Sequence, residues 1–374
     1  MNQLFAESNI GGMTLPNRFV RSATWEGMAT EDGSVTPKLV ETMAALAKGG
    51  VGLIISSHAY VSPEGQAGPW QLGIYKDELM EGLRKMTSAV HAAGGKIAAQ
   101  LAHAGCQAAA ALSKRAPLVV SDFEGLMTSP RKEMEGTDIR YVVTAFVDAA
   151  QRDKDSGFDA VQLRAAHGYL LNQFLSPAYN RRQDEYGGSV SNRARILLDI
   201  SRGVRETVGK DYPILVKMNC QDFIPKGLTL ADSLQAAQLL GQAGIDAIEL
   251  SGGMLSSGKL SPSRMGINSQ EKEAYFREEA RSFKKQISVP LILVGGLRSL
   301  EVAERIVEEG IADYLSMCRP FIREPGLINR WKSGDRGKAA CLSDNQCFKP
   351  GSEGKGIYCV VEEREQAKKV ESKK

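Results

Sequence analysis

The chain is poor in the residues and patterns that define several classes of protein. Among its 374 residues are only 6 cysteines, 4 histidines and 14 prolines. The cysteines are unevenly placed and do not have the spacing of a disulfide framework, so we expect a reducing, cytoplasmic setting. No stretch approaches 18 consecutive apolar residues, and the first residues lack the basic start and apolar run of a signal peptide. We therefore expect no transmembrane helix.

An excess of charge of one sign is lacking too. The chain has 47 basic and 44 acidic residues, for a formal net charge of +3. This balance argues against a protein that binds nucleic acid or a membrane surface. Glycine is frequent, with 38 residues, and 43% of the chain is hydrophobic, which excludes collagen, coiled coils and intrinsic disorder.

The sequence does contain a regular alternation of apolar runs and amphipathic segments. Strands are predicted at 19–23, 51–56, 96–101, 158–163, 212–218, 246–250, 290–295 and 313–317. Helices are predicted at 36–50, 76–93, 138–156, 189–208, 231–244, 270–286, 299–310 and 324–333. The strands are almost entirely apolar, as is typical of a parallel sheet with both faces buried. A doubly wound open sheet shares this alternation, but eight strands with long insertions after the third, fourth and sixth favour a closed barrel.

We therefore predict an α/β fold, a (β/α)8 TIM barrel over residues 1–335, followed by a short cysteine-containing C-terminal extension over residues 336–374. In such a barrel the chemistry lies at the C-terminal ends of the strands. After the last two strands stand the pair Gly295–Gly296 and Arg319, which suit a phosphate held by backbone N–H groups and one guanidinium. No glycine-rich dinucleotide fingerprint follows a strand, so we expect no Rossmann nicotinamide site.

The other strand ends carry a neutral amide, a cation and a group of proton donors. These are Gln100, Lys217, and the cluster of Arg164, His167 and Tyr169. The mixture is typical of a site for a large phosphorylated cofactor laid over the barrel mouth.

The longest motif is the run Arg164-Ala-Ala-His-Gly-Tyr-Leu-Leu-Asn-Gln-Phe-Leu-Ser-Pro, which continues to Asp184-Glu-Tyr-Gly-Gly-Ser and Asn192-Arg193. It resembles the signature of old yellow enzyme-type NADH:flavin oxidoreductases. Shorter matches to this family follow in the same order along the chain, at Pro16-Asn-Arg18, Ser22-Ala-Thr24, Gln100–Gly105, Gly295-Gly296 and Arg319-Pro320. The resemblance covers roughly residues 2–335.

The resemblance implies an FMN-binding barrel that reduces activated alkenes, with NADH or NADPH as the electron donor. Arg164 and His167 are expected to hold the carbonyl or nitro oxygen of an α,β-unsaturated substrate, where donors stabilise the negative charge that builds up during transfer. Tyr169 is expected to protonate the α-carbon while the flavin delivers a hydride to the β-carbon. The expected partner is a small-molecule substrate. The sequence leaves the oligomeric state open, a homo-oligomer included.

The same resemblance implies which residues contact the cofactor. Gln100 would bind the pyrimidine edge of the flavin, and Lys217 would lie near its N1/C2 carbonyl. The other expected contacts are with the ring, from Ala23, Thr24, Trp25 and His58, and with the phosphate, from Gly295, Gly296, Cys318 and Arg319.

Four positions depart from the family pattern. Arg164 stands where histidine is usual. A permanent planar cation favours a carboxylate or another charged oxygen over a neutral ketone, so we hypothesise a substrate that is anionic near its reacting centre. Lys217 stands where arginine is common, which keeps the charge but not the bidentate geometry. Trp25 replaces a small residue and is expected to narrow the pocket, and Cys106 replaces an arginine at the rim.

The extension departs from the family in its cysteines. Longer members bind an iron–sulfur cluster through four cysteines just after the barrel. The corresponding positions here are Cys341, Asp344, Cys347 and Cys359, so a carboxylate replaces one thiolate. Because iron–sulfur ligation favours a full thiolate set, we expect a degenerate cysteine cluster that binds no iron–sulfur cluster. The alternatives are a zinc ion or a cluster held by these three thiolates and the carboxylate.

Other functions stay open on the sequence alone. A relative of trimethylamine dehydrogenase would keep the flavin barrel but oxidise an amine or another small molecule. A non-catalytic flavin-binding barrel would retain FMN, but Arg164 would prevent its pocket from binding the substrate oxygen. A phosphate-sugar isomerase would share the phosphate site but has no use for Gln100. For single residues the alternatives are structural, with Gly295–Gly296 as a tight turn, His58 as a core histidine and Tyr169 as a packing residue.

Overall fold

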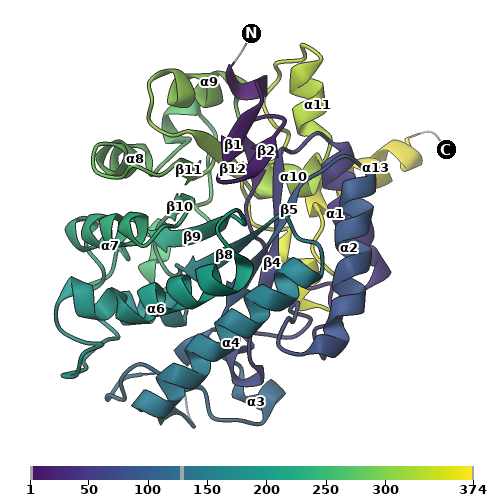
Figure 1. Cartoon of the computed structure of the whole chain (residues 1–374). Coiled ribbons are helices and arrows are strands. Elements are labelled where there is room, and N and C mark those ends of the chain that lie inside the picture. The colour runs from purple at the N-terminus through teal and green to yellow at the C-terminus, as the bar shows by residue number, and fades with distance from the viewer. Residues whose placement is uncertain (1–2, 127–129, 373–374) are drawn as a thin grey trace.

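The computed structural model describes residues 3–126 and 130–372. Eight parallel strands form a closed barrel in which each strand pairs with its two neighbours (Figure 1). The strands are β3 Phe19–Arg21, β4 Leu53–Tyr60, β5 Ile97–Ala102, β8 Ala160–Ala165, β9 Ile214–Asn219, β10 Ala247–Ser251, β11 Leu291–Val294 and β12 Tyr314–Met317. All eight lie on predicted strands, so the predicted (β/α)8 barrel is confirmed.

Helices lie between consecutive strands and after the last strand, and they cover the outside of the barrel (Figure 1). They are α1 Pro37–Lys48, α2 Met80–Ala92, α4 Gly136–Asp155, α6 Val190–Val208, α7 Leu230–Gln242, α8 Arg277–Lys284, α9 Leu300–Glu308, α10 Arg319–Arg323 and α11 Leu327–Lys332. The starts of α1, α6 and α7 follow ordinary capping rules. Helix α1, for example, begins after Thr36, whose hydroxyl accepts the N–H of Leu39, with a proline in its first turn.

Two predicted helices are wrong in extent. The segment predicted as a helix over 270–286 has only one short 3-10 turn, η6 Gln270–Lys272, before α8 begins at Arg277. Between them the Glu273 carboxylate accepts the backbone N–H groups of Arg298 and Ser299, at 2.7 and 2.9 Å, which ties this stretch to the loop after β11. The helix predicted over 324–333 is α11, and a separate short helix, α10, precedes it.

An unpredicted hairpin fills the N-terminal end of the barrel. Its strands are β1 Ser8–Ile10 and β2 Met13–Leu15. Ile10, Met13 and Leu15 are buried against interior residues such as Val20 and Leu53. Since apolar side chains fill this end, ligand chemistry is left to the opposite end, where the strands terminate.

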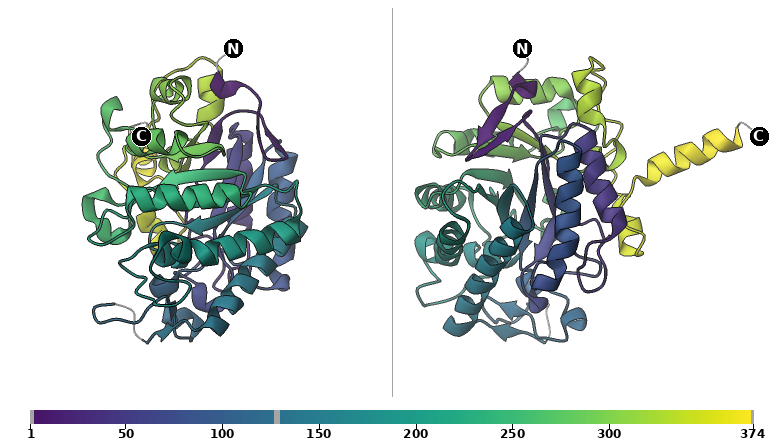
Figure 2. Two further views of the ribbon diagram at one scale, coloured as in Figure 1. Left: turned by 60° about the vertical axis from the view of Figure 1, so that its left-hand side comes forward. Right: turned by 45° about the vertical axis from the view of Figure 1, so that its right-hand side comes forward.

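The insertions and the extension complete the fold. The shorter elements are α3 Ala110–Ser113, β6 Leu118–Val119, β7 Lys132–Glu133, α5 Leu170–Leu175, α12 Phe348–Ser352 and α13 Val360–Glu371. The extension packs on the barrel, with the Ile357 N–H donating to the Glu26 carbonyl at 2.8 Å. Its last helix, α13, then projects away from the body (Figure 2). The boundary at residue 335 stays a prediction. None of the helices within the described ranges is long and apolar enough to cross a lipid bilayer.

Candidate active site

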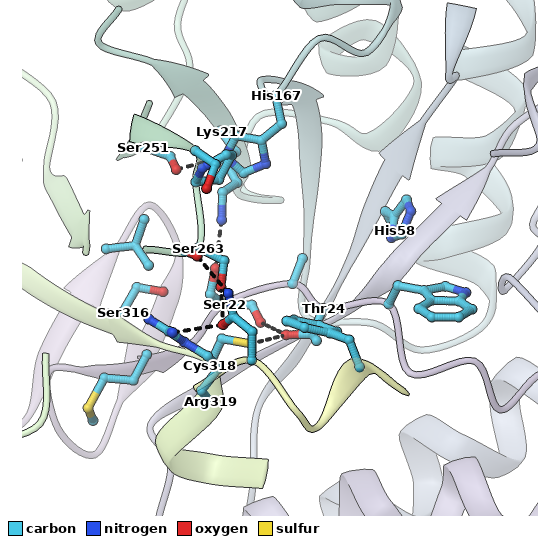
Figure 3. A pocket seen from close by; sticks show the side chains of 18 of the residues that line it. Ser22, Thr24, His58, His167, Lys217, Ser251, Ser263, Ser316, Cys318 and Arg319 are labelled. Carbon is cyan, nitrogen blue, oxygen red and sulfur yellow. Dashed lines mark hydrogen bonds between the residues drawn. The ribbon is translucent and has the colours of Figure 1, made fainter. Parts of the chain in front are cut away.

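A cavity of about 610 Å³ lies at the C-terminal ends of the barrel strands (Figure 3). Eleven of the thirteen predicted site residues line it, namely Ala23, Thr24, Trp25, His58, Arg164, His167, Tyr169, Lys217, Gly296, Cys318 and Arg319. Gly295 and Gln100 are not among the lining residues. The structure therefore brings together most of the residues that the sequence singles out, from all parts of the chain.

The cavity is strongly cationic. Arg164, Lys217, Arg298 and Arg319 line it, and none of the lining residues in the described chain is aspartate or glutamate. Cations in a confined, low-dielectric cavity act more strongly than they would in water, so the site favours an anionic ligand. Arg298 was not predicted from the sequence, although it lies two residues after the glycine pair Gly295–Gly296.

A buried carboxylate below the cavity, inside the barrel, binds three of the lining residues. Glu249 is fully buried in β10 and accepts hydrogen bonds from Lys217 Nζ (3.0 Å), Ser22 Oγ (2.7 Å) and Ser316 Oγ (2.8 Å). Burial opposes ionisation, but Lys217 and the hydrogen bonds outweigh it and lower the pKa of Glu249. Burial lowers the pKa of Lys217, an effect that Glu249 opposes. A glutamate within the apolar run 246–250 was the sequence signal for this buried pair.

A chain of amides joins this pair to Arg164. Gln162 Nε2 donates to Glu249 Oε2 at 2.9 Å, and Gln100 Nε2 donates to Gln162 Oε1 at 2.6 Å. Arg164 Nη1 then donates to Gln100 Oε1 at 2.9 Å. Gln100 is completely buried and uses both ends of its amide in this chain. Its contact with a flavin stays a prediction.

The long motif builds a tight turn after β8. His167 and Gly168 both have left-handed backbone conformations, with φ of 63° and 78°. A left-handed histidine is uncommon and has to be held by its surroundings. Asn219 Oδ1 accepts the His167 N–H at 3.2 Å, Asn172 Oδ1 accepts the Gly168 N–H at 2.6 Å, and Gln173 Nε2 donates to the Gly168 carbonyl at 2.6 Å. Asn172 and Gln173 of the motif, together with Asn219 of β9, therefore fix the turn that places His167 and Tyr169 at the cavity.

The predicted catalytic residues form one cluster. The Arg164 guanidinium stacks over the Tyr169 ring at 4.0 Å, and the Tyr169 hydroxyl lies 2.9 Å from His58 Nε2. Arg164 Nη2 lies 3.3 Å from His167 Nδ1, and His167 Nε2 lies 2.7 Å from Ser251 Oγ. An arginine can only donate, so Nδ1 of His167 is the acceptor and its Nε2 carries the proton. Sequence reasoning placed His58 beside the flavin and did not foresee its contact with Tyr169.

Burial and neighbouring cations set the protonation of this cluster. Burial first, and then Arg164 and Lys217, bring the pKa of His58 and that of His167 well below the ordinary histidine value. Both imidazoles are therefore neutral at pH 7. Burial raises the pKa of Tyr169, and Arg164 opposes this rise, so the phenol keeps its proton.

The opposite wall is shared between the barrel and the extension. Arg319 Nη1 donates to the Arg264 carbonyl and to Asn345 Oδ1, both at 2.8 Å. Asn345 Nδ2 in turn donates to the Ser263 carbonyl at 2.8 Å. The extension residues that line the cavity are Ser343, Asn345 and Phe348. Sequence reasoning missed them because no local pattern shows that the extension returns to the barrel mouth.

The cysteines of the extension do not assemble a metal site here. Cys341, Cys347 and Cys359 are free thiols. Within residues 3–126 and 130–372, no three His, Cys, Asp or Glu side chains are grouped as a metal ion requires. Burial raises the pKa of Cys347 to about 12, so this thiol is protonated.

Comparisons with known proteins agree with this geometry. A family model described as the NADH:flavin oxidoreductase / NADH oxidase family matches residues 3–337. The chain is 38% identical to an NADH oxidase of Thermoanaerobacter brockii over 349 aligned positions, covering 91% of this chain and 52% of that protein. It is 32% identical to a 4,4'-dithiodibutanoate disulfide reductase of Rhodococcus erythropolis over 391 aligned positions, covering 96% of this chain and 94% of that protein.

The fold comparison points the same way. The structure of a 2-naphthoyl-CoA reductase complex superposes with a TM-score of 0.89 at 28% identity, over 96% of this chain and 57% of that one. The chain thus spans about half the length of the Thermoanaerobacter relative and of this reductase, but nearly all of the Rhodococcus relative. The family predicted from the run after Arg164 is confirmed: the chain belongs to the NADH:flavin oxidoreductase / NADH oxidase family.

Proposed function

We propose that this protein is an FMN-dependent NAD(P)H oxidoreductase that reduces the activated C=C bond of an anionic α,β-unsaturated substrate. The observation that carries the proposal is the convergence of Arg164, His167 and Tyr169 in one cationic cavity at the barrel mouth. These three side chains supply two donors for a substrate oxygen and one acid, which is the set that reduction of a conjugated alkene requires.

The donor set of the cavity fits FMN, whose phosphate is anionic and whose ring carries carbonyl oxygens. Its volume of about 610 Å³ falls among pockets that hold ligands of this size, about 300–1,000 Å³. We assign the phosphate to Arg319 and Arg298 beside Gly296, and the carbonyl edge of the ring to Lys217. When bound, the flavin would supply the hydride, which it takes from NADH or NADPH.

Gly296 offers a direct test of the proposed phosphate site beside it. Its φ is +73°, and a Cβ there would lie 2.8 Å from Tyr275 Cε1. Gly310 is the matched control, with φ of +65° and nothing within 4 Å of its Cβ position. Both alanine variants are expected to lose about 1–2 kcal/mol of stability from left-handed strain. Only Gly296→Ala is also expected to displace Tyr275 and weaken FMN binding by about tenfold, measured by quenching of flavin fluorescence. Equal FMN affinities in the two variants would count against this assignment.

Arg164, His167 and Tyr169 have separate roles in the proposed reaction. Arg164 has five N–H groups and gives one to Gln100 and one to His167, so it retains donors for a substrate oxygen. The His167 Nε2–H would leave Ser251 to become the second donor. Tyr169 gives its phenol proton to the α-carbon of the substrate. Because the two histidines are neutral, the negative charge that develops on the substrate oxygen is stabilised by the cations.

Charge selects the substrate class. Once Arg298, Arg319 and Lys217 are assigned to FMN, Arg164 is the cation of the described cavity lining that remains for the substrate, and it lies next to the acid Tyr169. No aspartate or glutamate of the described lining opposes it. A carboxylate conjugated to the alkene would bind here more tightly than a neutral ketone. The Rhodococcus relative is named for a substrate with two carboxylates, 4,4'-dithiodibutanoate, which agrees with this preference.

The same relative favours a second candidate function. Reductive cleavage of a carboxylated disulfide needs one hydride and one proton and yields two thiols, which the same cavity could supply. The two functions separate in a direct assay. An enzyme reduced by NADPH and mixed with 4,4'-dithiodibutanoate releases free thiol if the second function holds, and none if alkene reduction is the only activity.

The proposal is tested first by the visible spectrum of the purified protein under anaerobic conditions. We expect flavin bands that bleach when NADH or NADPH is added. A protein that cannot be reconstituted with FMN contradicts the proposal entirely. Retained FMN that neither nicotinamide reduces would instead favour the amine dehydrogenase or the non-catalytic flavin barrel.

A further inference from the structure

His58 contacts the acid of the cluster. Its Nε2 lies 2.9 Å from the Tyr169 hydroxyl oxygen, and the two rings meet edge to face with centroids 5.4 Å apart. Both side chains are buried, with His58 6% and Tyr169 8% exposed. His58 belongs to β4 and Tyr169 to the turn after β8. The Gln71 amide donates to the His58 carbonyl at 3.0 Å, which holds this end of β4 in place.

An oxygen–nitrogen contact between a phenol and a neutral imidazole can form in two ways. If Tyr169 donates to Nε2 of His58, the histidine holds the phenol proton and the substrate cannot receive it. If the Nε2–H of His58 donates to the phenol oxygen, the O–H of Tyr169 is free to turn into the cavity. Only the second arrangement leaves Tyr169 able to act as an acid toward a substrate.

We propose that His58 is a positioning residue for Tyr169, whose Nε2–H directs the phenol O–H toward the substrate and stabilises the phenolate left after proton transfer. In this step the O–H bond of Tyr169 breaks, a C–H bond forms at the α-carbon of the substrate, and water later returns a proton to the phenolate. The Arg164 guanidinium, stacked on the same ring at 4.0 Å, stabilises the same charge from another side. The inference rests on the proposed function and extends it to a residue that acts through Tyr169.

The surroundings of His58 keep its imidazole neutral, which this role requires. The charged and titratable groups around it are Arg164, His167 and Tyr169 from the β8 side and Lys217 from β9. The carboxylate of Glu249 lies below them and is bonded to Lys217 rather than to the histidine. With cations and no carboxylate beside it, His58 is not protonated near neutral pH and can present one N–H to the phenol.

The test separates hydride transfer from protonation. A nitroalkene that has received a hydride is a stable nitronate anion, so return of the flavin band reports hydride transfer and appearance of nitroalkane reports protonation. In His58→Phe we expect protonation to slow by about 10- to 100-fold, the effect of losing one hydrogen bond to a charged oxygen. In His58→Gln, which keeps an N–H donor, we expect it within about threefold of the wild type. His91→Gln, on the outer helix α2, controls for replacement of a histidine.

The outcomes distinguish the inference from the function on which it rests. A wild type whose flavin is reduced by NADPH but is reoxidised neither by a nitroalkene nor by a cinnamate-type acid refutes the proposed function. Equal protonation rates in the wild type and His58→Phe refute the role of His58 alone.

A second measurement does not depend on turnover. In holoenzyme labelled with 13Cζ-tyrosine, the Tyr169 resonance, identified by its absence in Tyr169→Phe, should titrate at least one pH unit lower in the wild type than in His58→Phe. One unit corresponds to a tenfold change in acidity. Equal titration midpoints in the two proteins, or a higher midpoint in the wild type, contradict the inference.

Discussion

Tyr169→Phe is expected to slow product formation by about 10²–10⁴-fold while flavin reduction by NADPH stays within about twofold of the wild type. The substitution removes only the hydroxyl oxygen, which is the acid of the proposed reaction. The ring keeps its place beneath Arg164 and its packing against Ala102 and Ala104, so the fold and the cavity are retained. Anaerobic stopped-flow measurement of the two half-reactions gives both rates.

Tyr186→Phe is the matched control. Tyr186 lies in the same insertion after β8 but packs edge-on against Phe174, away from the cavity lining. Its variant should keep both rates. Product formation by Tyr169→Phe at the wild-type rate would show that the proton comes from another group.

Lys217→Met is expected to destabilise the folded protein by about 3–5 kcal/mol, because it leaves the fully buried Glu249 without its cation. The readout is a lower midpoint of urea unfolding at pH 7. The double variant Lys217→Met/Glu249→Gln removes both charges, and we expect it to recover most of this loss. A single variant that unfolds at the wild-type urea concentration would contradict the buried ion pair.

The pH dependence of this loss has a definite sign. In the wild type the folded-state pKa of Glu249 is lowered, so its contribution is present above the ordinary carboxyl value of about 4.3 and is lost as the pH falls through the lower folded value. In Lys217→Met, burial without the cation should raise that pKa instead. The deficit of the variant is therefore largest at neutral pH and shrinks as the pH falls toward 4.3, which unfolding at two pH values measures.

The barrel was predictable because its strands are buried on both faces. The strands β5 and β8 are buried along their whole length, so they appear in the sequence as short apolar runs. The hairpin of β1 and β2 was missed because three-residue strands give too short a pattern to recognise. The start of α8 was misplaced because Glu273 is bound by backbone groups more than 20 residues away, at Arg298 and Ser299, and no local preference shows such a contact.

The candidate site was predictable only in part, for a similar reason. The motif after Arg164 is long because its side-chain amides bind the backbone of one turn. Both the turn and the amides lie in one segment, so the sequence shows them together. The partner of Tyr169 is not visible, since His58 is 111 positions away along the chain. Asn345 could not be linked to Arg319 for the same reason, as only the folded extension brings them within 2.8 Å. Residue types were therefore predictable where one segment carries them, and pairings were not.

The most direct test of the account is single-turnover reoxidation of the NADPH-reduced enzyme by a cinnamate-type acid and by cyclohexenone, in the wild type and in Arg164→His. The account predicts that the acid restores the flavin bands at least about tenfold faster than the neutral enone in the wild type, and that Arg164→His loses this preference. Faster reoxidation by the enone, or an Arg164→His variant that keeps its full preference for the acid, would contradict the proposed anionic substrate. Failure of both compounds to restore the bands would contradict alkene reduction itself.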